Sequence, residues 1–449
     1  MRGLIVTALL ALSACASAPL PPPIDQPATS AIAPSRAPDL DGDVIALAFS
    51  GGGARAASFS LGVLQGLRDM RGADGARLLD HVHVLTSVSG GAITAAYFAL
   101  HGAEGLDTFR AAYLDKNWAG QLHIAAYSPA NWTRAWSGGL NRQDRFADWL
   151  DREVFAHASM ADLRARSGLR IWINSTDLYN GTPFAFTPLY FDALCADLDH
   201  VRVADAVAAS MAFPVVFKPV VAQPYPEHCA PLPAWALRAP TNRDATALER
   251  RTAQAFASYR DPARLRYVQL VDGGVLDNLG LSTLALLRQT ADTPYSPLSA
   301  RDAVRIRRLT FLVVNAEKVR TAAWTLTQSG PNGPQTADTL FDLQTESTNR
   351  ASYDYFRRVA ADWERDLSAW RCALSAEDVA RYGGGVGWAC ADIHISVDMI
   401  SFNDLPEPQR SHLGVAATAV TLPRDLIDGL IAGGRQAVMQ NPAALALTH

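Results

Sequence analysis

Unbroken apolar runs and helical patterns alternate along the first part of the chain. Residues 44–49 form one such run, as expected for a strand buried on both faces, and residues 82–85 form the next. Between them, apolar side chains at residues 59–70 recur every three or four positions, which is the period of a helix with one buried face. This strand–helix–strand unit predicts a right-handed parallel crossover, so both strands should end at the same edge of one sheet.

The same alternation continues downstream. Further strands are predicted at residues 170–174, 267–271, 309–314 and 393–397. Helices are predicted at residues 92–100, 244–259 and 426–439. Strands that alternate with helices favour an α/β fold with a mainly parallel central sheet, which binds ligands beyond the carboxyl ends of its strands.

Length and composition allow a large apolar core. The chain has 449 residues, of which 49% are hydrophobic, so it can form one α/β domain with insertions or two domains. Two stretches look like insertions: the tryptophan-rich residues 117–150 and the proline-containing residues 224–265. The net charge is -4 and Lys and Arg do not cluster, which argues against nucleic acid as a partner. The tryptophans of the first stretch are Trp118, Trp132, Trp136 and Trp149. We expect them either at a lipid interface or in the core.

The N-terminus has the pattern of an export signal. Arg2 precedes an apolar stretch at residues 4–12 that is too short to span a bilayer, and small residues follow it. Cys15 directly after these small residues resembles a bacterial lipobox, so residues 1–15 are predicted to be a lipoprotein signal peptide with its lipobox. The resemblance implies cleavage before Cys15 and acylation of its thiol. The alternative is an ordinary signal peptide cut a few residues later.

Residues 16–40 are rich in Pro, Ala and Ser, and this composition predicts an extended tether. A tether suits a domain that stands off a membrane in which Cys15 is anchored. Ala16 occupies the position where an inner-membrane retention signal would have Asp, so the resemblance to lipoproteins implies the outer membrane. We therefore expect an exported, lipid-anchored protein whose domain lies in the periplasm or at the cell surface.

The cysteines other than Cys15 favour disulfides, because their even number in an exported chain is typical of pairing. Cys372 with Cys390 would close a short loop and is the preferred pair, which leaves Cys195 with Cys229. Unpaired buried thiols and zinc are the alternatives, although zinc-binding spacings such as CxxC or HExxH do not occur in the chain. We predict neither a metal nor a cofactor.

Ser89 is the candidate nucleophile. It lies between a predicted strand and a predicted helix, in Ser87-Val88-Ser89-Gly90-Gly91. A sharp strand-to-helix turn, or nucleophile elbow, exposes the serine hydroxyl and needs small neighbours because strand and helix pack tightly around it. The N-terminus of the following helix also favours developing negative charge. The alternative is a loop that only turns the chain, since Ser87 replaces the first Gly of the G-x-S-x-G motif.

A glycine loop, Gly51-Gly52-Gly53, ends the first strand and is followed closely by Arg55. Consecutive glycines let backbone N–H groups approach an oxyanion without side-chain interference. The loop could instead cradle a dinucleotide phosphate, because Gly51 and Gly53 with Ala56 fit the relaxed G-x-G-x-x-G/A spacing. Against this alternative, the second strand ends in Thr-Ser, where an acidic ribose partner would be expected.

Asp272 is the candidate base. It follows the apolar strand at residues 267–271 and precedes Gly273 and Gly274. A carboxylate at a strand end can reach a serine on a neighbouring strand and take its proton. The alternative is a turn aspartate that accepts hydrogen bonds from backbone amides, a role that we assign to Asp277.

These elements, in this order, resemble the patatin-like phospholipase family, whose pattern is a glycine-rich oxyanion loop with a basic residue, a serine elbow and a catalytic Asp in a D-G-[AG] turn. Residues 174–178 with Gly181 resemble the T-D block of the family, and residues 209–220 resemble its A-S-x-A-x-P-x-x-F-x-P block. The resemblance covers roughly residues 44–282. It implies a three-layer α/β/α fold with helical insertions.

The resemblance also implies domain limits and residue roles. We place the catalytic core at residues 43–282 and assign residues 283–449 to the completion of the same α/β domain. Ser89 and Asp272 would form a dyad that cleaves an ester bond of a membrane lipid or lipid-like substrate through an acyl-enzyme, and the glycine loop with Arg55 would bind the oxyanion. Arg55 would orient this loop or pair with a lipid phosphate, unless it is a surface residue at a helix start.

Two other functions stay open at this stage. An esterase with a Ser-His-Asp triad needs a histidine after Asp272 in chain order, and His394 and His412 are the candidates. The chain could also be a lipid-binding or scaffolding lipoprotein without turnover, because a fold does not define a function. No particular oligomeric state is predicted.

Overall fold

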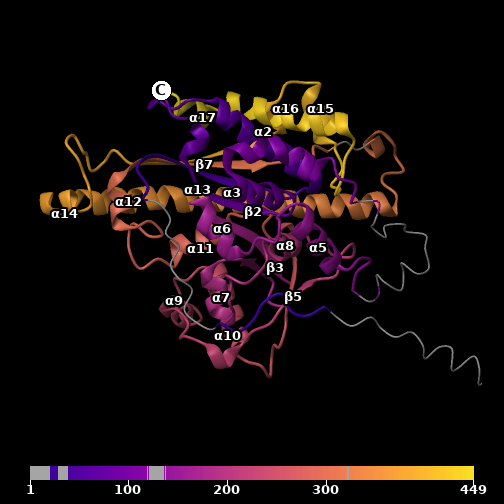
Figure 1. The fold of residues 1–449 in the computed structure, drawn as a ribbon, viewed down its shortest axis with the longest axis horizontal. Coiled ribbons are helices and arrows are strands. Elements are labelled where there is room, and N and C mark those ends of the chain that lie inside the picture. Colours follow the sequence, from indigo (N-terminus) through magenta and orange to yellow (C-terminus); the bar gives the residue numbers. More distant parts are fainter. Residues whose placement is uncertain (1–20, 29–38, 119, 121–135, 137, 321–322) are drawn as a thin grey trace, which may run out of the picture.

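The computed structural model describes residues 21–28, 39–118, 120, 136, 138–320 and 323–449. Within these residues, strands form one 8-stranded sheet (Figure 1) in the order β5–β6–β3–β2–β1–β7–β8, and β4 pairs with β3 outside this path. The strands are β1 (Gly42–Phe49), β2 (Val82–Val88), β3 (Arg170–Asp177), β4 (Thr182–Ala185), β5 (Val220–Ala222), β6 (Val268–Asp272), β7 (Ile306–Asn315) and β8 (His394–Ser401). Strands β3, β2, β1, β7 and β8 pair in parallel, so the predicted α/β fold with a mainly parallel sheet is confirmed.

Helices cover both faces of the sheet and give it three layers. Alternate side chains of β1 point to opposite faces, so Ile45 and Leu47 belong to one apolar cluster and Val44 and Ala46 to the other. Helices α2, α3 and α16 contribute to the first cluster, and α11, α12 and α13 contribute to the second (Figure 1). The helices are α2 (Gly53–Asp69), α3 (Gly90–Phe109), α5 (Gln143–Glu153), α6 (Met160–Ser167), α7 (Pro188–Leu194), α8 (Val203–Ser210), α9 (Ala234–Arg238), α10 (Ala247–Tyr259), α11 (Ser282–Gln289), α12 (Ala300–Arg305), α13 (Gly333–Cys372), α14 (Ala376–Arg381), α15 (Gln409–Gly414), α16 (Arg424–Gln440) and α17 (Pro442–Ala446).

The last third of the chain extends the sheet that the first third begins. Strand β7 pairs with β1 along its whole length, and β8 pairs with β7. Helix α16 packs so closely on α2 that a Cβ added at Gly62 would lie 2.0 Å from the Ile431 carbonyl oxygen. Residues from the first and the last third of the chain therefore pack together around β1.

Part of the tryptophan-rich stretch belongs to the core. Helix α5 buries Phe146 completely, and the rings of Trp118 and Trp149 stack with 5.5 Å between their centroids. Trp136 is 95% exposed, and Trp132 lies outside the described residues. The proline-containing stretch likewise contributes the buried face of α10 to the core.

Part of the predicted tether lies on the folded domain. The Ile24 N–H donates to the Val221 carbonyl oxygen at 2.9 Å, and the Ala28 N–H donates to the Cys195 carbonyl oxygen at 3.1 Å. Residues 24–28 therefore differ from the extended tether that their composition predicts, because an edge of the domain satisfies their backbone groups. The predicted export signal and its cysteine lie outside the described residues.

Two disulfides tie surface segments to this scaffold. Cys195, at the end of α7, is bonded to Cys229 in the segment before α9. Cys372, at the end of α13, is bonded to Cys390 just before β8. Both links connect a helix end to a loop and thus limit the freedom of the loop.

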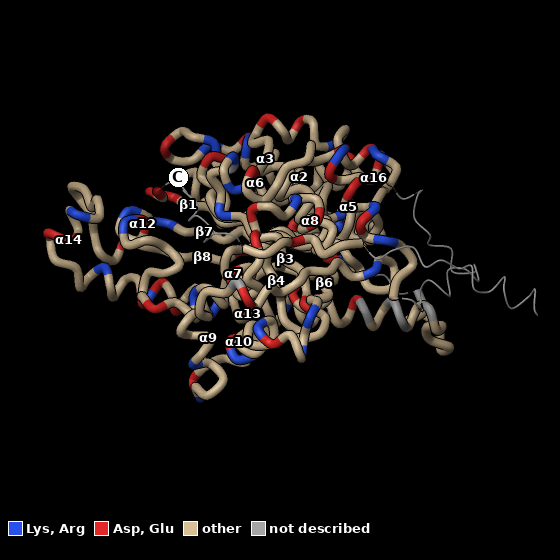
Figure 2. Tube along the Cα trace, turned by 60° about the horizontal axis from the view of Figure 1, so that its bottom comes forward, with Lys and Arg blue, Asp and Glu red and all other residues tan. Residues whose placement is uncertain are grey.

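Charged residues of both signs are interspersed on the outside of the molecule. Lys and Arg alternate with Asp and Glu over the outer helices and loops (Figure 2), and many of them form local ion pairs, such as Arg305 with Asp41 at 2.7 Å. Among the described residues, no helix is both long enough and apolar enough to cross a membrane.

Candidate active site

Ser89 occupies a strained turn between β2 and α3. Its backbone has φ 50° and ψ -123°, a conformation that non-glycine residues rarely adopt. A Cβ added at Gly90 would lie 2.0 Å from the Gly53 carbonyl oxygen, and one added at Gly91 would lie 2.6 Å from the Ser50 carbonyl oxygen. The elbow therefore needs both glycines, because the glycine loop lies directly against it.

Ser87 takes the place of the first glycine of the elbow motif without disturbing it. The side chain is fully buried, and its hydroxyl donates to the Trp172 carbonyl oxygen at 3.1 Å. Since the hydroxyl has a partner on β3, the departure from the motif is accommodated inside the sheet.

The pairing of β3 explains how Asp272 reaches Ser89. Asn174 of β3 pairs with β2 on one side and with β4 on the other, while the next residue, Ser175, pairs with Asp272 of β6 and with β4. Strands β2 and β6 therefore lie on the same side of β3, one after the other. Because β6 runs antiparallel to β3, the carboxyl ends of β2 and β6 meet there.

The two side chains form a direct hydrogen bond at this junction. The Ser89 hydroxyl donates to Asp272 Oδ2 at 2.8 Å, and the Gly274 N–H donates to Asp272 Oδ1 at 2.8 Å. Both side chains are buried, with relative exposures of 7% for Ser89 and 6% for Asp272. A carboxylate held in this way can accept the serine proton without an intervening histidine.

Burial sets the protonation of Asp272. Loss of solvent raises the pKa of Asp272 to about 6, although the hydrogen bonds from Gly274 and Ser89 act in the opposite direction. The carboxyl is therefore a stronger base than an exposed aspartate, and it is ionised above pH 6.

Two residues that the sequence analysis did not single out hold the elbow in place. The Ser89 N–H donates to Ser210 Oγ at 2.8 Å, and Ser210 in turn donates to the Asn174 carbonyl oxygen at 2.5 Å. The Asn174 side chain donates to Thr86 Oγ1 and to the Ser87 carbonyl oxygen. Asn174 and Ser210 belong to the two family-like blocks, so that resemblance was the signal that could have identified them.

The glycine loop presents fewer free donors than its sequence predicts. The Gly51 N–H donates to the Asn278 carbonyl oxygen at 3.1 Å, so its predicted role as an oxyanion donor is wrong. Gly51 is needed for space instead, because an added Cβ would lie 2.4 Å from Asn278 Oδ1 and 3.2 Å from the Ser89 Cβ. No described residue accepts a hydrogen bond from the N–H groups of Gly52 and Gly53, and both residues have positive φ.

Arg55 anchors the start of α2 from inside the protein. It is 4% exposed, its Nε donates to the Ala316 carbonyl oxygen at 2.8 Å, and its Nη1 donates to the Ala416 carbonyl oxygen at 2.5 Å. Burial lowers its pKa to about 10, which leaves it charged at neutral pH. The alternative of a surface residue at a helix start is therefore wrong, and these contacts support the predicted role of Arg55 in orienting the glycine loop.

A small cavity of about 60 Å³ lies beside Ser89. Phe213 and Val275 give it apolar walls, and the chain after β7 and helix α13 give it a charged rim. On this rim Lys318 pairs with Asp342 at 3.4 Å, and Arg320 pairs with Glu346. The C-terminal part thus lines the site as well as completing the sheet, which the local sequence did not indicate.

The histidine candidates lie away from this cavity. His394 begins β8, has a side chain that is 72% exposed, and is 4.0 Å from Glu364. His412 is exposed on α15, and no histidine of the described segments lines the cavity beside Ser89. Nor do the described residues contain a cluster of His, Cys, Asp or Glu suited to a metal ion.

A serine at a nucleophile elbow, a paired carboxylate and a glycine loop at one edge of an α/β sheet define a site of the serine-hydrolase type. The family model described as patatin-like phospholipase matches residues 47–285, which is more than half of the chain. The chain belongs to the patatin-like phospholipase family, so the resemblance seen in the sequence motifs is confirmed.

Solved structures similar to this chain include one human and one bacterial protein. Human GIVD cytosolic phospholipase A2 is 13% identical with a TM-score of 0.41, and the match covers 89% of this chain and 58% of that one. VipD from Legionella pneumophila is 12% identical with a TM-score of 0.34, and the match covers 98% of this chain and 73% of that one. The chain thus spans less than two thirds of the length of the human enzyme. No curated protein matches the sequence.

Proposed function

We propose that this protein is a serine acyl hydrolase that cleaves ester bonds of lipids, including phospholipids, with Ser89 as nucleophile and Asp272 as base. The observation that carries the proposal is the 2.8 Å hydrogen bond from Ser89 Oγ to Asp272 Oδ2 in a member of the patatin-like phospholipase family. The N–H groups of Gly52 and Gly53 donate to no described residue and lie close to the elbow, so they would supply donors for a developing oxyanion.

The proposed reaction has two halves. Asp272 takes the Ser89 proton while Oγ attacks the ester carbonyl, and the glycine loop stabilises the oxyanion of the tetrahedral intermediate. The intermediate collapses when the C–O bond to the alcohol breaks, and the alcohol oxygen takes the proton back from Asp272. Water, deprotonated by Asp272, then attacks the acyl-enzyme, and the fatty acid leaves as Ser89 recovers its proton.

The geometry favours this dyad over the Ser-His-Asp triad. Asp272 already occupies the hydrogen-bonding position next to the serine hydroxyl, where a triad would place its histidine. His394 and His412 do not line the cavity beside Ser89. We therefore expect the exchange of either histidine for Ala to leave hydrolysis largely intact.

Labelling with a fluorophosphonate probe tests the proposed function and separates it from a lipid-binding protein without turnover. The wild-type chain should be labelled, and Ser89→Ala and Asp272→Asn should lose labelling and ester hydrolysis while they remain folded. Ser60→Ala is a matched control, because Ser60 is a buried serine of α2 with no hydrogen-bond partner among the described residues. Wild-type activity in Ser89→Ala would exclude the proposal, and a panel of phospholipids, lysophospholipids and short-chain esters would define the substrate.

We further propose that the chain is exported and anchored through an acylated Cys15, with its domain facing the outer membrane from the periplasm or the cell surface. The lipobox-like sequence before Cys15 and the Pro/Ala-rich residues that follow it support this proposal. A lipid anchor would keep the domain next to its proposed substrate.

A further inference from the structure

A second and larger cavity lies on the face of the sheet opposite to α2 and α16. Its volume is about 310 Å³, and its walls come from the starts of β2 and β3, from β7, and from helices α11 and α13. Val84, one of its wall residues, precedes Ser89 by five positions on β2, which corresponds to about 16 Å along a strand. The two cavities therefore lie toward opposite ends of the same strand.

The floor of this cavity is apolar and buried. Phe311, Phe356 and Leu309 form part of it, with relative exposures of 5%, 3% and 2%. Protein interiors leave few voids larger than a water molecule, and one water needs only about 15 Å³. Because the floor offers almost no hydrogen-bonding groups, a cavity of this size suits an apolar chain better than water.

Two polar atoms at the wall of the cavity are buried without a partner. These are Trp363 Nε1 and Thr187 Oγ1, and no described residue forms a hydrogen bond with either one. Each of the two side chains belongs to a residue that is 5% exposed. Buried polar groups of folded proteins almost always have a partner, so these two atoms point to a ligand oxygen.

Each of the two residues has an exposed neighbour in the chain. Thr187 precedes the exposed Pro188, and Trp363 lies one helical turn before Asp366, whose side chain is 57% exposed. A ligand whose head lies at the two polar atoms would extend its tail over the phenylalanine floor.

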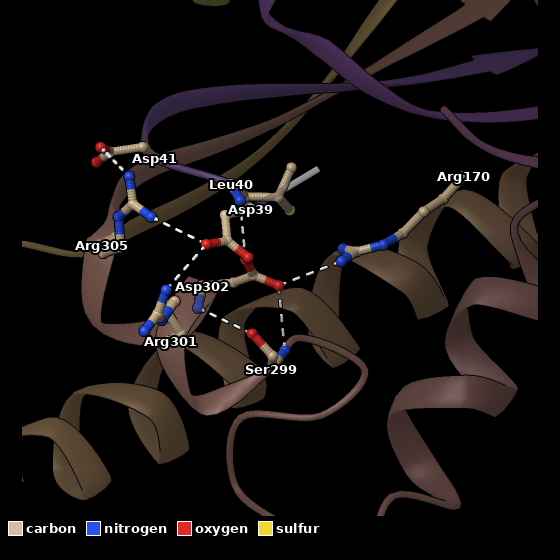
Figure 3. A network of polar contacts seen from close by, with 8 residues as sticks. All are labelled: Asp39, Leu40, Asp41, Arg170, Ser299, Arg301, Asp302 and Arg305. Carbon is tan, nitrogen blue, oxygen red and sulfur yellow. Dashed lines mark hydrogen bonds and ion pairs between the residues drawn. The ribbon is translucent and has the colours of Figure 1, made fainter. Parts of the chain in front are cut away.

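Two arginines line the same cavity, and each forms an ion pair with an aspartate. Arg288 pairs with Asp366 at 2.6 Å, and Arg170 pairs with Asp302 at 3.2 Å. Figure 3 shows Arg170 reaching toward Asp302 beside Leu40, which also lines the cavity. A guanidinium has five N–H groups, and the Asp302 pair uses only Nη2 of Arg170, so this side chain retains donors for an anionic head.

We propose that this cavity is a second lipid site that holds one fatty acid, with its alkyl chain on Phe311 and Phe356 and its carboxylate near Trp363 and Thr187. The proposal goes beyond the hydrolytic function and does not depend on it, because Ser89 lies outside this cavity.

Calorimetric titration of the full-length Ser89→Ala protein with dodecanoate, below its micellar concentration, tests the site. Ala360→Phe would fill the cavity, and Ala351→Phe makes the same change on the exposed side of the same helix. We expect Ala360→Phe to lose one bound dodecanoate and Ala351→Phe to retain it. Equal binding by the two variants would overturn the proposal.

A second variant keeps the test valid if the larger side chain disturbs folding. Trp363→Phe retains the aromatic ring but removes the N–H donor, so dodecanoate should bind about tenfold more weakly. Dodecanol should bind the unmodified cavity at least about tenfold more weakly than dodecanoate, since it lacks the charge. Unchanged affinity in Trp363→Phe, or equal affinity for the acid and the alcohol, would contradict the carboxylate site.

Fluorophosphonate labelling of the same cavity variants with Ser89 restored separates this proposal from the proposed hydrolase. Labelling should persist in Ala360→Phe and Trp363→Phe, because neither residue lines the cavity beside Ser89. Loss of labelling in folded Ala360→Phe and Trp363→Phe would place these residues in the hydrolytic site and overturn the independent lipid site.

Discussion

The backbone conformation of Ser89 and the burial of Asp272 both reduce the stability of the folded protein. The backbone of Ser89 lies in a region that costs roughly 1–3 kcal/mol for a non-glycine residue. Asp272 is a buried carboxyl without an ion-pair partner among the described side chains that contact it, and its pKa of about 6 records the resulting cost of ionisation. Strain and burial at the same two residues are what a preorganised nucleophile and base require.

The pKa of Asp272 predicts how hydrolysis depends on pH. The proposed base acts only as a carboxylate, so kcat/KM for a soluble short-chain ester should rise with pH and level off above about pH 6. A pH–rate profile measured between pH 4 and 9 checks this expectation. A profile that is flat from pH 4 upward would show that another group limits the reaction.

The same pKa predicts that Asp272→Asn stabilises the protein at alkaline pH. The folded-state pKa of about 6 lies above the ordinary value of 3.8, so unfolding favours loss of the proton and stability falls as the pH rises from about 4 to 6. Above pH 6 the ionised carboxyl costs up to about 3 kcal/mol, because a difference of one in pKa corresponds to about 1.36 kcal/mol. Asp272→Asn removes this cost.

Denaturant unfolding at pH 4 and pH 8 measures the difference in stability between Asp272→Asn and the wild-type protein. The free energy of unfolding of Asp272→Asn should exceed that of wild type at pH 8, and the gap should narrow at pH 4. Ser89→Ala is the control, since it keeps the carboxyl and should keep the pH dependence of the wild type. A gap that widens at pH 4 would contradict the sign of the effect.

At the scale of elements, the site depends on helix α2 being held against β7. Arg55 makes this link, because it donates to the carbonyl oxygens of Ala316 just after β7 and Ala416 just after α15. The glycine loop lies between β1 and this anchored helix start. The position of this loop therefore depends on contacts that are distant in sequence.

Arg55→Met should misplace the glycine loop while leaving substrate binding largely unchanged. We expect kcat to fall about tenfold to hundredfold with little change in KM, because the loop acts on the transition state. Arg55→Lys should restore part of kcat, since an ammonium can still reach one carbonyl oxygen. Steady-state kinetics on a soluble ester give both constants.

Arg68→Met provides the matched control on the same helix. Arg68 lies in the last turn of α2 and pairs at the surface with Asp107 at 2.9 Å. An exposed pair of this kind contributes little, so this variant should behave as the wild type. Unchanged kcat in a folded Arg55→Met would remove Arg55 from the positioning of the loop.

At the scale of the whole molecule, two cavities lie toward opposite ends of β2. The cavity with the charged rim lies at the carboxyl end of β2 next to Ser89, and the apolar cavity lies toward the start of β2 against α13. Residues 24–28 are held at a third place, beside β5 and the end of α7. The segment that follows the proposed anchor thus packs in part on the domain.

The proposed anchor predicts where the protein is found in a bacterial cell. Cys15→Ser should abolish incorporation of radiolabelled palmitate and remove the protein from the outer-membrane fraction. Ala16→Asp is the matched control, because it keeps the acylated cysteine and should redirect the labelled protein to the inner membrane. Palmitate labelling that persists in Cys15→Ser would exclude this anchor.

The sequence by itself determined the parts of this protein that depend on short-range pattern. The sequence predicted the correct positions of the apolar runs that become β1 and β2, of the turn at Ser89 and of the aspartate at the end of β6. These positions are predictable because the residues of a buried element are themselves apolar. The short strands β4 and β5 were not predicted, since three or four residues carry too little periodicity.

Only the tertiary structure decided how these parts meet. The antiparallel direction of β6 brings Asp272 to the end of β2, and no local pattern encodes that pairing. Three further features of the site depend on partners far away in the sequence. They are the hydrogen-bonded N–H of Gly51, the buried guanidinium of Arg55 and the charged rim from α13. Hydrophobic pattern reports that a side chain is buried, whereas the partner against which it is buried is set by packing of the whole chain.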